Sequence, residues 1–216
     1  MHTERLAENL RSLVRGDPDA KLLISVLRNH PEEYEAFWHP LGFVHIKIVG
    51  VNDTRIHLWP LNARFQEPHF GIHDHVFRIH SVVLFGSLTS VTYMIEPEDK
   101  SPTHCIYDVD YQPGRSLLLR SGNRIRCQKV EETKQRAGTA YTVAPGVFHS
   151  SERAGFEPAV SLVRTSQNQA VRPRVVGPLD GHSSYEYVRT QLGTPDLTAV
   201  LNTFFPSQEG FAHRGN

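Results

Sequence analysis

Three histidines form the most conspicuous group of residues that could do chemistry. His73 and His75 are separated by one residue, and His149 follows much later in the chain. Side chains two residues apart on an extended segment point to the same face, so His73 and His75 can share one site. A third imidazole from a returning strand completes a set that suits Fe, Zn, Cu or Ni and leaves coordination positions open. The spacing therefore predicts a three-histidine metal site.

The flanking residues favour a metal site over a solvent-exposed histidine pair without a function. A histidine pair at this spacing also occurs on solvated sheet faces, where it binds nothing. Here Gly71 precedes the pair, and Gly138 and the run Pro145 to His149 repeat the order of turn, strand and histidine. A glycine next to a ligand lets the backbone pass close to other groups. The repeated pattern favours two neighbouring strands that present their histidines to one ion.

The elements that would position these histidines are short strands. From residue 43 onwards, apolar residues follow the β period, and glycine, proline, asparagine and aspartate separate the segments. Many short strands at regular spacing indicate a sandwich or barrel. The expected strands are Phe43–Val49, Arg55–Trp59, Phe70–His75, Ile79–Phe85, Leu88–Ile95, His104–Tyr111, Ser116–Leu119, Ile125–Val130, Thr139–Val143, Val147–Ser150 and Ala159–Thr165. Residues 131–136 are predicted to form a charged hairpin tip.

Helices are expected at both ends of the chain. Apolar residues at helical spacing predict helical segments that begin near Thr3, Asp19 and Pro31, the last ending at Trp38. Residues 172–193 read as loops, and Thr194 is expected to cap a short helix that ends near Leu201. The predicted organisation is a helical extension over residues 1–42, a barrel over 43–176 and a loop-and-helix extension over 177–216.

Composition limits the partners. The 216 residues include 23 basic and 23 acidic ones, so the formal net charge of zero favours neither nucleic acid nor an anionic membrane. No apolar run is long enough to span a membrane and no signal pattern opens the chain, which predicts a cytoplasmic protein. Cys105 and Cys127 lack metal-type spacing and are expected to be buried free thiols. The edge strands of an open barrel and the helical addition favour a homodimer that acts on a small molecule.

At the level of motifs, the chain resembles the cupins. The shared features are the His73-x-His75 pair, the strand ending at Gly86, Gly138, Pro145-Gly146 and His149. In particular, Ile72–His75, Leu84–Leu88 and Glu157–Leu162 are similar to segments of the cysteine dioxygenase type. The resemblance implies an all-β cupin (jelly-roll) β-barrel. It also implies Fe(II) held by His73, His75 and His149, with Zn, Ni, Cu or Mn as alternative ions.

Several positions depart from that family. Where many cupins have a glutamate after the second histidine, this chain has His80, which is either a fourth ligand or a packed histidine. Cysteine dioxygenases carry Ser, His and Tyr at alternate positions of the last core strand, whereas this chain has Ser161, Val163 and Thr165. No cysteine stands near His80 to form a thioether crosslink, and His45 and Lys47 occupy the region of the family's substrate arginine. Free cysteine is therefore not the expected substrate.

Other residues are candidates for work at the site. Tyr93, Tyr141 and His80 are candidate catalytic residues, because each lies in a predicted strand and can point inwards; core packing is the competing interpretation. The candidate substrate-binding residues are Arg55, His57 and Arg164. Arg55 and His57 alternate with Trp59 and would present a cation, an imidazole and an aromatic wall to a ligand. A place on the solvated rim of the barrel is their alternative.

The predicted function is that of a mononuclear non-haem iron oxygenase, which uses dioxygen and a small substrate at a site like that of the thiol dioxygenases. Three neutral ligands leave the ion its full dipositive charge, which favours an anionic donor on the substrate. Two alternatives stay open. One is a non-redox lyase, isomerase or hydrolase that uses the metal as a Lewis acid. The other is a cupin that binds a small ligand without turnover.

Overall fold

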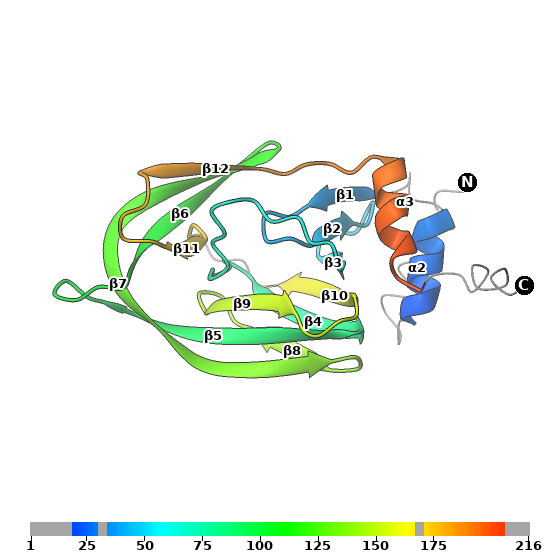
Figure 1. Ribbon diagram of the computed structural model, residues 1–216, viewed down its shortest axis with the longest axis horizontal. Coiled ribbons are helices and arrows are strands. Elements are labelled where there is room, and N and C mark those ends of the chain that lie inside the picture. Colours follow the sequence, from blue (N-terminus) through cyan, green and yellow to red (C-terminus); the bar gives the residue numbers. More distant parts are fainter. Residues whose placement is uncertain (1–18, 30–33, 167–170, 206–216) are drawn as a thin grey trace, which may run out of the picture.

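The computed structural model of the chain describes residues 19–29, 34–166 and 171–205. Strands dominate, and the two described helices lie together at one end of the molecule (Figure 1). The helix expected near Thr3 falls outside the described residues. The second expected helix is confirmed as α2 (Ala20–Asn29), which places Leu23, Ile24 and Leu27 on one buried face.

The strands form two antiparallel sheets. The first has the order β1-β2-β3-β10-β4-β8, and the second has the order β11-β6-β7-β5-β9, with β12 paired to β7. The bounds are β1 Glu35–Trp38, β2 Val44–Lys47, β3 Thr54–Trp59, β4 Arg78–Phe85, β5 Ser87–Pro97, β6 His104–Gln112, β7 Arg115–Arg136, β8 Ala140–Val143, β9 Phe148–Arg153, β10 Ala159–Ser166, β11 Arg174–Gly177 and β12 Ser184–Val188.

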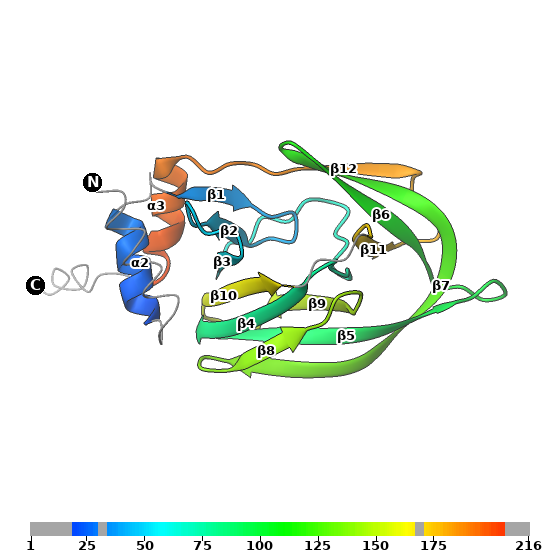
Figure 2. The same ribbon diagram turned by 180° about the vertical axis from the view of Figure 1, so that it is seen from behind.

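The topology is that of a jelly roll. The chain passes repeatedly between the two sheets, so β3, β10, β4 and β8 face β7, β5 and β9 across the barrel (Figures 1 and 2). The segment around His73 completes the second sheet, because His73 and His149 form an antiparallel bridge beside β9. Two sheets built from crossing connections in this way are the double Greek key of jelly-roll domains. The predicted all-β, jelly-roll fold class is confirmed.

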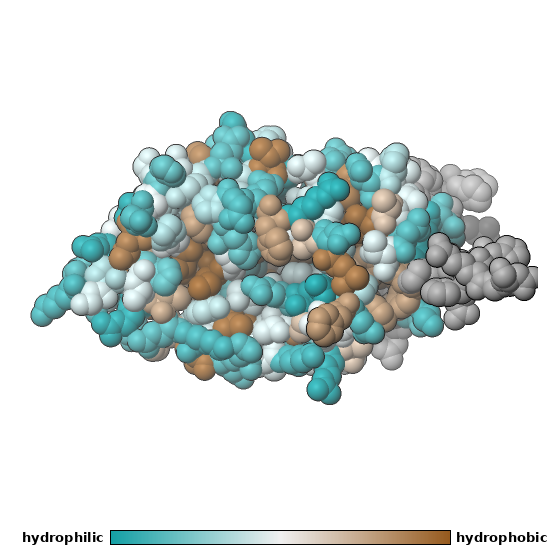
Figure 3. Space-filling model, in the orientation of Figure 1, coloured by the Kyte–Doolittle hydropathy of each residue, from teal (hydrophilic) through white to brown (hydrophobic). Residues whose placement is uncertain are grey.

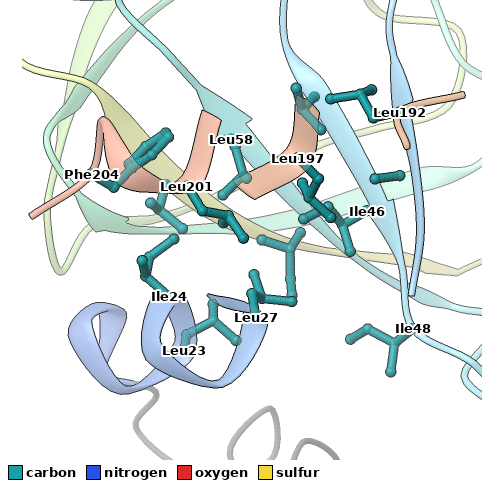
Figure 4. Close-up of a cluster of buried hydrophobic side chains, with 14 of the residues drawn as sticks. Leu23, Ile24, Leu27, Ile46, Ile48, Leu58, Leu192, Leu197, Leu201 and Phe204 are labelled. Carbon is teal, nitrogen blue, oxygen red and sulfur yellow. The ribbon is translucent and has the colours of Figure 1, made fainter. Parts of the chain in front are cut away.

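The helices cover the outer face of the first sheet. Figure 4 shows the cluster formed by side chains from α2, from the sheet and from α3 (Thr194–Asn202). Arg28 at the end of α2 also donates hydrogen bonds to the carbonyls of Leu201 (2.9 Å) and Phe205 (3.0 Å). Leu201 lies in the last turn of α3 and Phe205 just beyond it, so Arg28 joins the ends of the two helices. Gly193, rather than the predicted Thr194, is the N-cap of α3.

The sheet beneath the helices has two chemically different faces. On β3, Ile56 and Leu58 are fully buried in the helical cluster, whereas Arg55 and His57 alternate with them and line a cavity on the opposite side. Alternate residues of a strand point to opposite faces, so this pattern separates the two roles. The larger apolar cluster of this sheet therefore lies under the helices, whereas its inner face combines polar groups with a smaller apolar cluster around Phe43 and Trp59.

Four sequence expectations were wrong about local structure. Residues 35–38 form β1 instead of continuing a helix, because they pair with β2. Residues 70–75 make single bridges rather than a regular strand. The two strands and charged tip expected between 116 and 136 are one continuous strand, β7, whose second half pairs with β5 over residues 87–97. The tail expected to be loops contains the short strands β11 and β12.

Hydrophilic and apolar side chains are interspersed on the face shown in Figure 3. Neither described helix has the length and apolar character that a membrane crossing requires. Cys105 and Cys127 are both free thiols, as predicted; Cys105 is buried, as expected of both, whereas Cys127 is partly exposed.

Candidate metal centre

The structure brings His73, His75 and His149 together. One ring nitrogen from each lies within 4.8 Å of the other two. The ring centroids are 4.8 Å apart for His73 and His75, 4.6 Å for His73 and His149, and 5.1 Å for His75 and His149. Among the described residues this is the group of histidine, cysteine and acidic side chains that could hold an ion.

Main-chain hydrogen bonds fix the two ligand segments to each other. The amide of His73 donates to the carbonyl of His149 (3.0 Å), and the amide of His149 donates back to His73 (2.9 Å). The amide of Gly146 also donates to the carbonyl of His75 (2.9 Å), which places the Pro145-Gly146 turn against the far end of the pair. The reciprocal bonds are those of a hydrogen-bonded pair in an antiparallel ladder. Residues distant in sequence are thus held at a fixed separation.

Hydrogen bonds from Nδ1 of His73 and His149 leave Nε2 of each ring free to bind a metal. Nδ1 of His73 donates to the carbonyl of Gly71 (2.9 Å), and Nδ1 of His149 donates to the carbonyl of Val147 (3.2 Å). A carbonyl can only accept, so Nδ1 carries the proton in both rings and Nε2 has a free lone pair. Metal-binding histidines are commonly oriented by this kind of bond. The donor set therefore fits a transition-metal ion.

All three imidazoles are neutral near pH 7. Burial, followed by the charge of His73, lowers the pKa of His149 to about 3. Burial also lowers the pKa of His73 and holds that of His75 well below its ordinary value, and the neighbouring histidines and Arg55 lower the pKa of His75 further. A metal ligand must be deprotonated, so the site needs no proton release from these rings when an ion binds at neutral pH.

A buried ion pair holds the ligand segment from behind. Asp74 lies between the two histidines and is only 4% exposed. It accepts hydrogen bonds from the main-chain amide (2.6 Å), Nε (2.8 Å) and a terminal nitrogen (2.6 Å) of Arg174 on β11. The guanidinium of Arg174 also lies over the ring of Phe148, 4.9 Å from its centroid. This two-point attachment between a carboxylate and a guanidinium fixes the direction of the His73–His75 backbone.

The three histidines open onto a cavity of about 600 Å³. The lining also carries polar groups of the inner sheet face, among them His45, Arg55 and His57, together with His39 and Arg189. Its aromatic lining is Phe43, Trp59, Phe77, Tyr111 and Tyr141. Pockets of this size accept molecules larger than a single amino acid. The arrangement provides a metal position, a polar wall and an aromatic surface around one space.

The other candidate residues divide into two groups. Arg55, His57 and Tyr141 line the cavity. His80 is exposed on β4, where its two ring nitrogens lie 3.3 Å from Thr142 Oγ1 and from Ser166 Oγ, away from the metal ligands. Tyr93 packs beside Phe148 outside the cavity.

Strand alternation explains these outward positions. His80 shares the parity of Val82 and Leu84, which pack on the helix-covered face of the sheet. Arg164 is exposed on β10, next to Val163, which lines the cavity. Neighbouring residues on a strand point to opposite faces, so both candidates face away from the ligands.

Sequence reasoning missed three residues of the cavity wall, which are His39, Tyr111 and Arg189. His39 directly follows β1, and its Nδ1 accepts a hydrogen bond from the amide of Leu41 (3.2 Å). Arg189 directly follows β12, a strand in which Tyr185 and Tyr187 alternate with polar residues. That alternation was the available signal for a strand in the tail.

Comparison with known proteins leaves the family unassigned. No model of a protein family matches the chain, and no curated protein matches it. Among solved structures, a crystal structure of Drosophila melanogaster CENP-C bound to CAL1 is similar at 13% sequence identity with a TM-score of 0.37. That match covers 68% of this chain and 96% of the CENP-C chain.

Proposed function

We propose that this protein is a mononuclear non-haem iron oxygenase, a cupin of the cysteine dioxygenase type that holds Fe(II) through His73, His75 and His149. The observation that carries the proposal is the set of three neutral imidazoles, at least two of them with Nε2 free, on one wall of a large cavity. Fe(II) bound by three neutral ligands would supply a dipositive centre that binds an anionic donor and activates dioxygen.

The residues of the chain prepare the site for this chemistry. Bonds from Gly71 and Val147 orient two of the rings, and the Asp74–Arg174 pair fixes the segment that carries the third. Burial removes the three imidazoles from bulk water, which strengthens electrostatic interactions among the groups around them. The small substrate binds beside the ligands, against the aromatic wall.

Free cysteine is not the proposed substrate. On β10, Ser161 accepts a hydrogen bond from Nε1 of Trp59 (3.1 Å) and is committed to that contact. Val163 and Thr165 line the cavity where cysteine dioxygenases carry a histidine and a tyrosine. Tyr141, a candidate from the sequence, lines the same cavity and can take part in the reaction, as can Tyr111.

The test is iron loading followed by measurement of oxygen consumption. Full-length protein is stripped of metal, reloaded anaerobically with Fe(II) and mixed with air and a panel of thiols, diketones and amino-acid derivatives. We expect about one iron per chain and substrate-dependent oxygen uptake. His149→Ala should lose most of the iron, whereas His80→Ala, which removes an exposed histidine, should keep it. Retention of zinc or nickel alone, with no oxygen uptake after reconstitution, would exclude the oxygenase.

A Lewis-acid enzyme is the second candidate. The observation that favours it is the absence of the oxygen-handling histidine and tyrosine from β10, where Val163 and Thr165 stand. A divalent ion such as Zn²⁺ or Ni²⁺ would then polarise a substrate oxygen without redox chemistry. Elemental analysis of protein purified without added metal separates the two candidates, because only the first requires iron.

A further inference from the structure

One side of the cavity carries an excess of positive charge. Lys47, Arg55 and Arg189 line it, and no aspartate or glutamate occurs among its lining residues in the described part of the chain. Lys47 is half exposed and forms an ion pair with Glu35 (3.6 Å). The charge of Lys47 is therefore offset, and the two guanidinium groups account for the excess.

Arg55 is placed close to the metal ligands. Its guanidinium lies over the ring of Phe77, 5.2 Å from the centroid, and the same ring stacks on His75 at 4.9 Å. Burial lowers the pKa of Arg55, and the charge of Arg189 lowers it further. The two cations thus repel each other within one cavity. No described carboxylate forms an ion pair with either of them.

Arg189 is held in position by groups that do not neutralise it. Its guanidinium lies over Tyr111, 4.6 Å from the ring centroid, and donates a hydrogen bond to Ser116 Oγ (3.2 Å). Its main-chain amide donates to the carbonyl of Gly114 (2.9 Å). The Nε atom is buried and has no hydrogen-bond partner in the described structure. The positive charge of Arg189 is therefore not neutralised by the groups that hold it in place.

From these observations we infer that Arg55 and Arg189 together bind an oxyanion, a carboxylate or a phosphate, carried by the substrate of this cavity. That the bound molecule is a substrate rests on the proposed function, whereas the binding of an anion by the two arginines does not. A planar guanidinium offers paired donors that match both kinds of oxyanion. The rest of the molecule lies on Phe43, Trp59 and Phe77, which suits a ring or another flat apolar body.

This arrangement selects for charge. His45 and His57 lie on the same wall, and burial lowers the pKa of His45 to about 3 and that of His57 well below its ordinary value. They are neutral at pH 7 and add hydrogen-bonding capacity without charge. A neutral or cationic molecule of the same shape leaves both guanidinium groups unpaired. The site should therefore discriminate strongly against amides and amines.

The test measures binding to metal-free protein, so that no ion takes part. Isothermal titration compares benzoate and phenyl phosphate, which are anions of the two classes, with benzamide, the neutral counterpart of benzoate. The variants are Arg55→Gln and Arg189→Gln. Arg115→Gln is the matched control, because Arg115 is half exposed and pairs with Glu186 outside the cavity. Thermal unfolding of every variant verifies that it is folded, and Arg189→Lys replaces Arg189→Gln if that variant does not fold.

We expect at least one anion to bind and benzamide to bind much more weakly. Loss of one charge-assisted contact should weaken the anion about 10- to 100-fold in Arg55→Gln and in Arg189→Gln, and leave Arg115→Gln unchanged. The tighter of the two anions identifies the oxyanion class. Equal binding of benzamide and benzoate, unchanged affinity in both cavity variants, or no binding of either anion overturns the inference.

The same measurements separate this inference from the proposed function. Wild-type protein that binds benzoate but takes up no iron refutes the oxygenase and leaves the anion site standing. If the protein takes up iron and consumes oxygen, but its affinity for anions is the same in the Arg55 and Arg189 variants, the oxygenase is supported and the anion site is refuted. His149→Ala should keep its affinity for the anion in either case, because His149 belongs to the metal wall.

Discussion

The Asp74–Arg174 pair allows an asymmetric prediction about stability. Asp74 is 4% exposed, whereas the side chain of Arg174 is 43% exposed. Replacing Asp74 by asparagine keeps the shape and leaves a guanidinium that water can reach. The donors of Arg174 then meet a neutral amide oxygen instead of a carboxylate, and these weaker hydrogen bonds should lower the free energy of unfolding by about 2 kcal/mol. The substitution removes the charge of Asp74 and leaves no unpaired charge in the interior, because the side chain of Arg174 reaches solvent.

Replacing Arg174 by methionine should be worse. The carboxylate of Asp74 then stays buried with the main-chain amide of residue 174 as its one remaining donor from this pair. Removing one partner of a buried ion pair costs about 3–5 kcal/mol, because the other charge is left uncompensated. We therefore expect Arg174→Met to be more destabilising than Asp74→Asn, although the arginine is the more exposed partner.

The assay is urea unfolding followed by tryptophan fluorescence and circular dichroism, with the m-value compared across variants. Arg115→Gln is the control, because it breaks a surface pair whose side chains are 50% and 49% exposed and should change stability by less than about 1 kcal/mol. An Asp74→Asn variant at least as destabilised as Arg174→Met would refute the reasoning. So would two variants that both behave like the surface control.

Two further predictions concern acid stability and a turn. His45 titrates near 6.5 when unfolded and at about 3 when folded, so its contribution to stability is complete above pH 6.5 and is lost as the pH falls towards 3. His45→Phe should reduce the slope of unfolding free energy between pH 6 and 4 by about 1.4 kcal/mol per pH unit, and an unchanged slope would contradict this. Gly86→Ala should cost more than about 3 kcal/mol, because the new Cβ would lie 2.3 Å from the carbonyl oxygen of Pro158 at a φ of +70°. Gly122→Ala has a similar φ and open space, so it should cost about 1–2 kcal/mol, and equal costs for the two would be inconsistent with the clash.

The barrel could be predicted from sequence because its strands alternate in character. Most of the expected strands and the final helix are present, and Ile56 and Leu58 alternate with Arg55 and His57 as the β period requires. The errors lie where local pattern and tertiary pairing disagree. Residues 35–38 follow a helical apolar period but become β1 by pairing with β2. The exposed charges of residues 131–136 resemble a turn, yet they continue β7 alongside β5.

The three histidines were easier to predict from the sequence than the other residues that line the cavity. Histidines with this spacing are uncommon enough to be noticed, and the sequence named all three members of the group that the structure brings together. Arg189 carried no comparable signal, because a lone arginine in a tail rich in proline and glycine is ordinarily solvated. Its position depends on the pairing of β12 with β7, a contact between segments some seventy residues apart.

The last strands have a meaning beyond their contribution to the sheets. Residues 34–166 contain the three histidines, Arg55 and strands β1 to β10, whereas Arg189 arrives afterwards, directly behind β12. The residues that would bind the metal therefore come earlier in the sequence than Arg189, which would help to determine substrate specificity. Sequence change confined to Arg189 and the residues next to it could change which compounds are accepted while leaving the three histidines and the Asp74–Arg174 pair untouched. Such a division makes the tail a natural place for related chains to diverge in specificity, and for an engineer to begin.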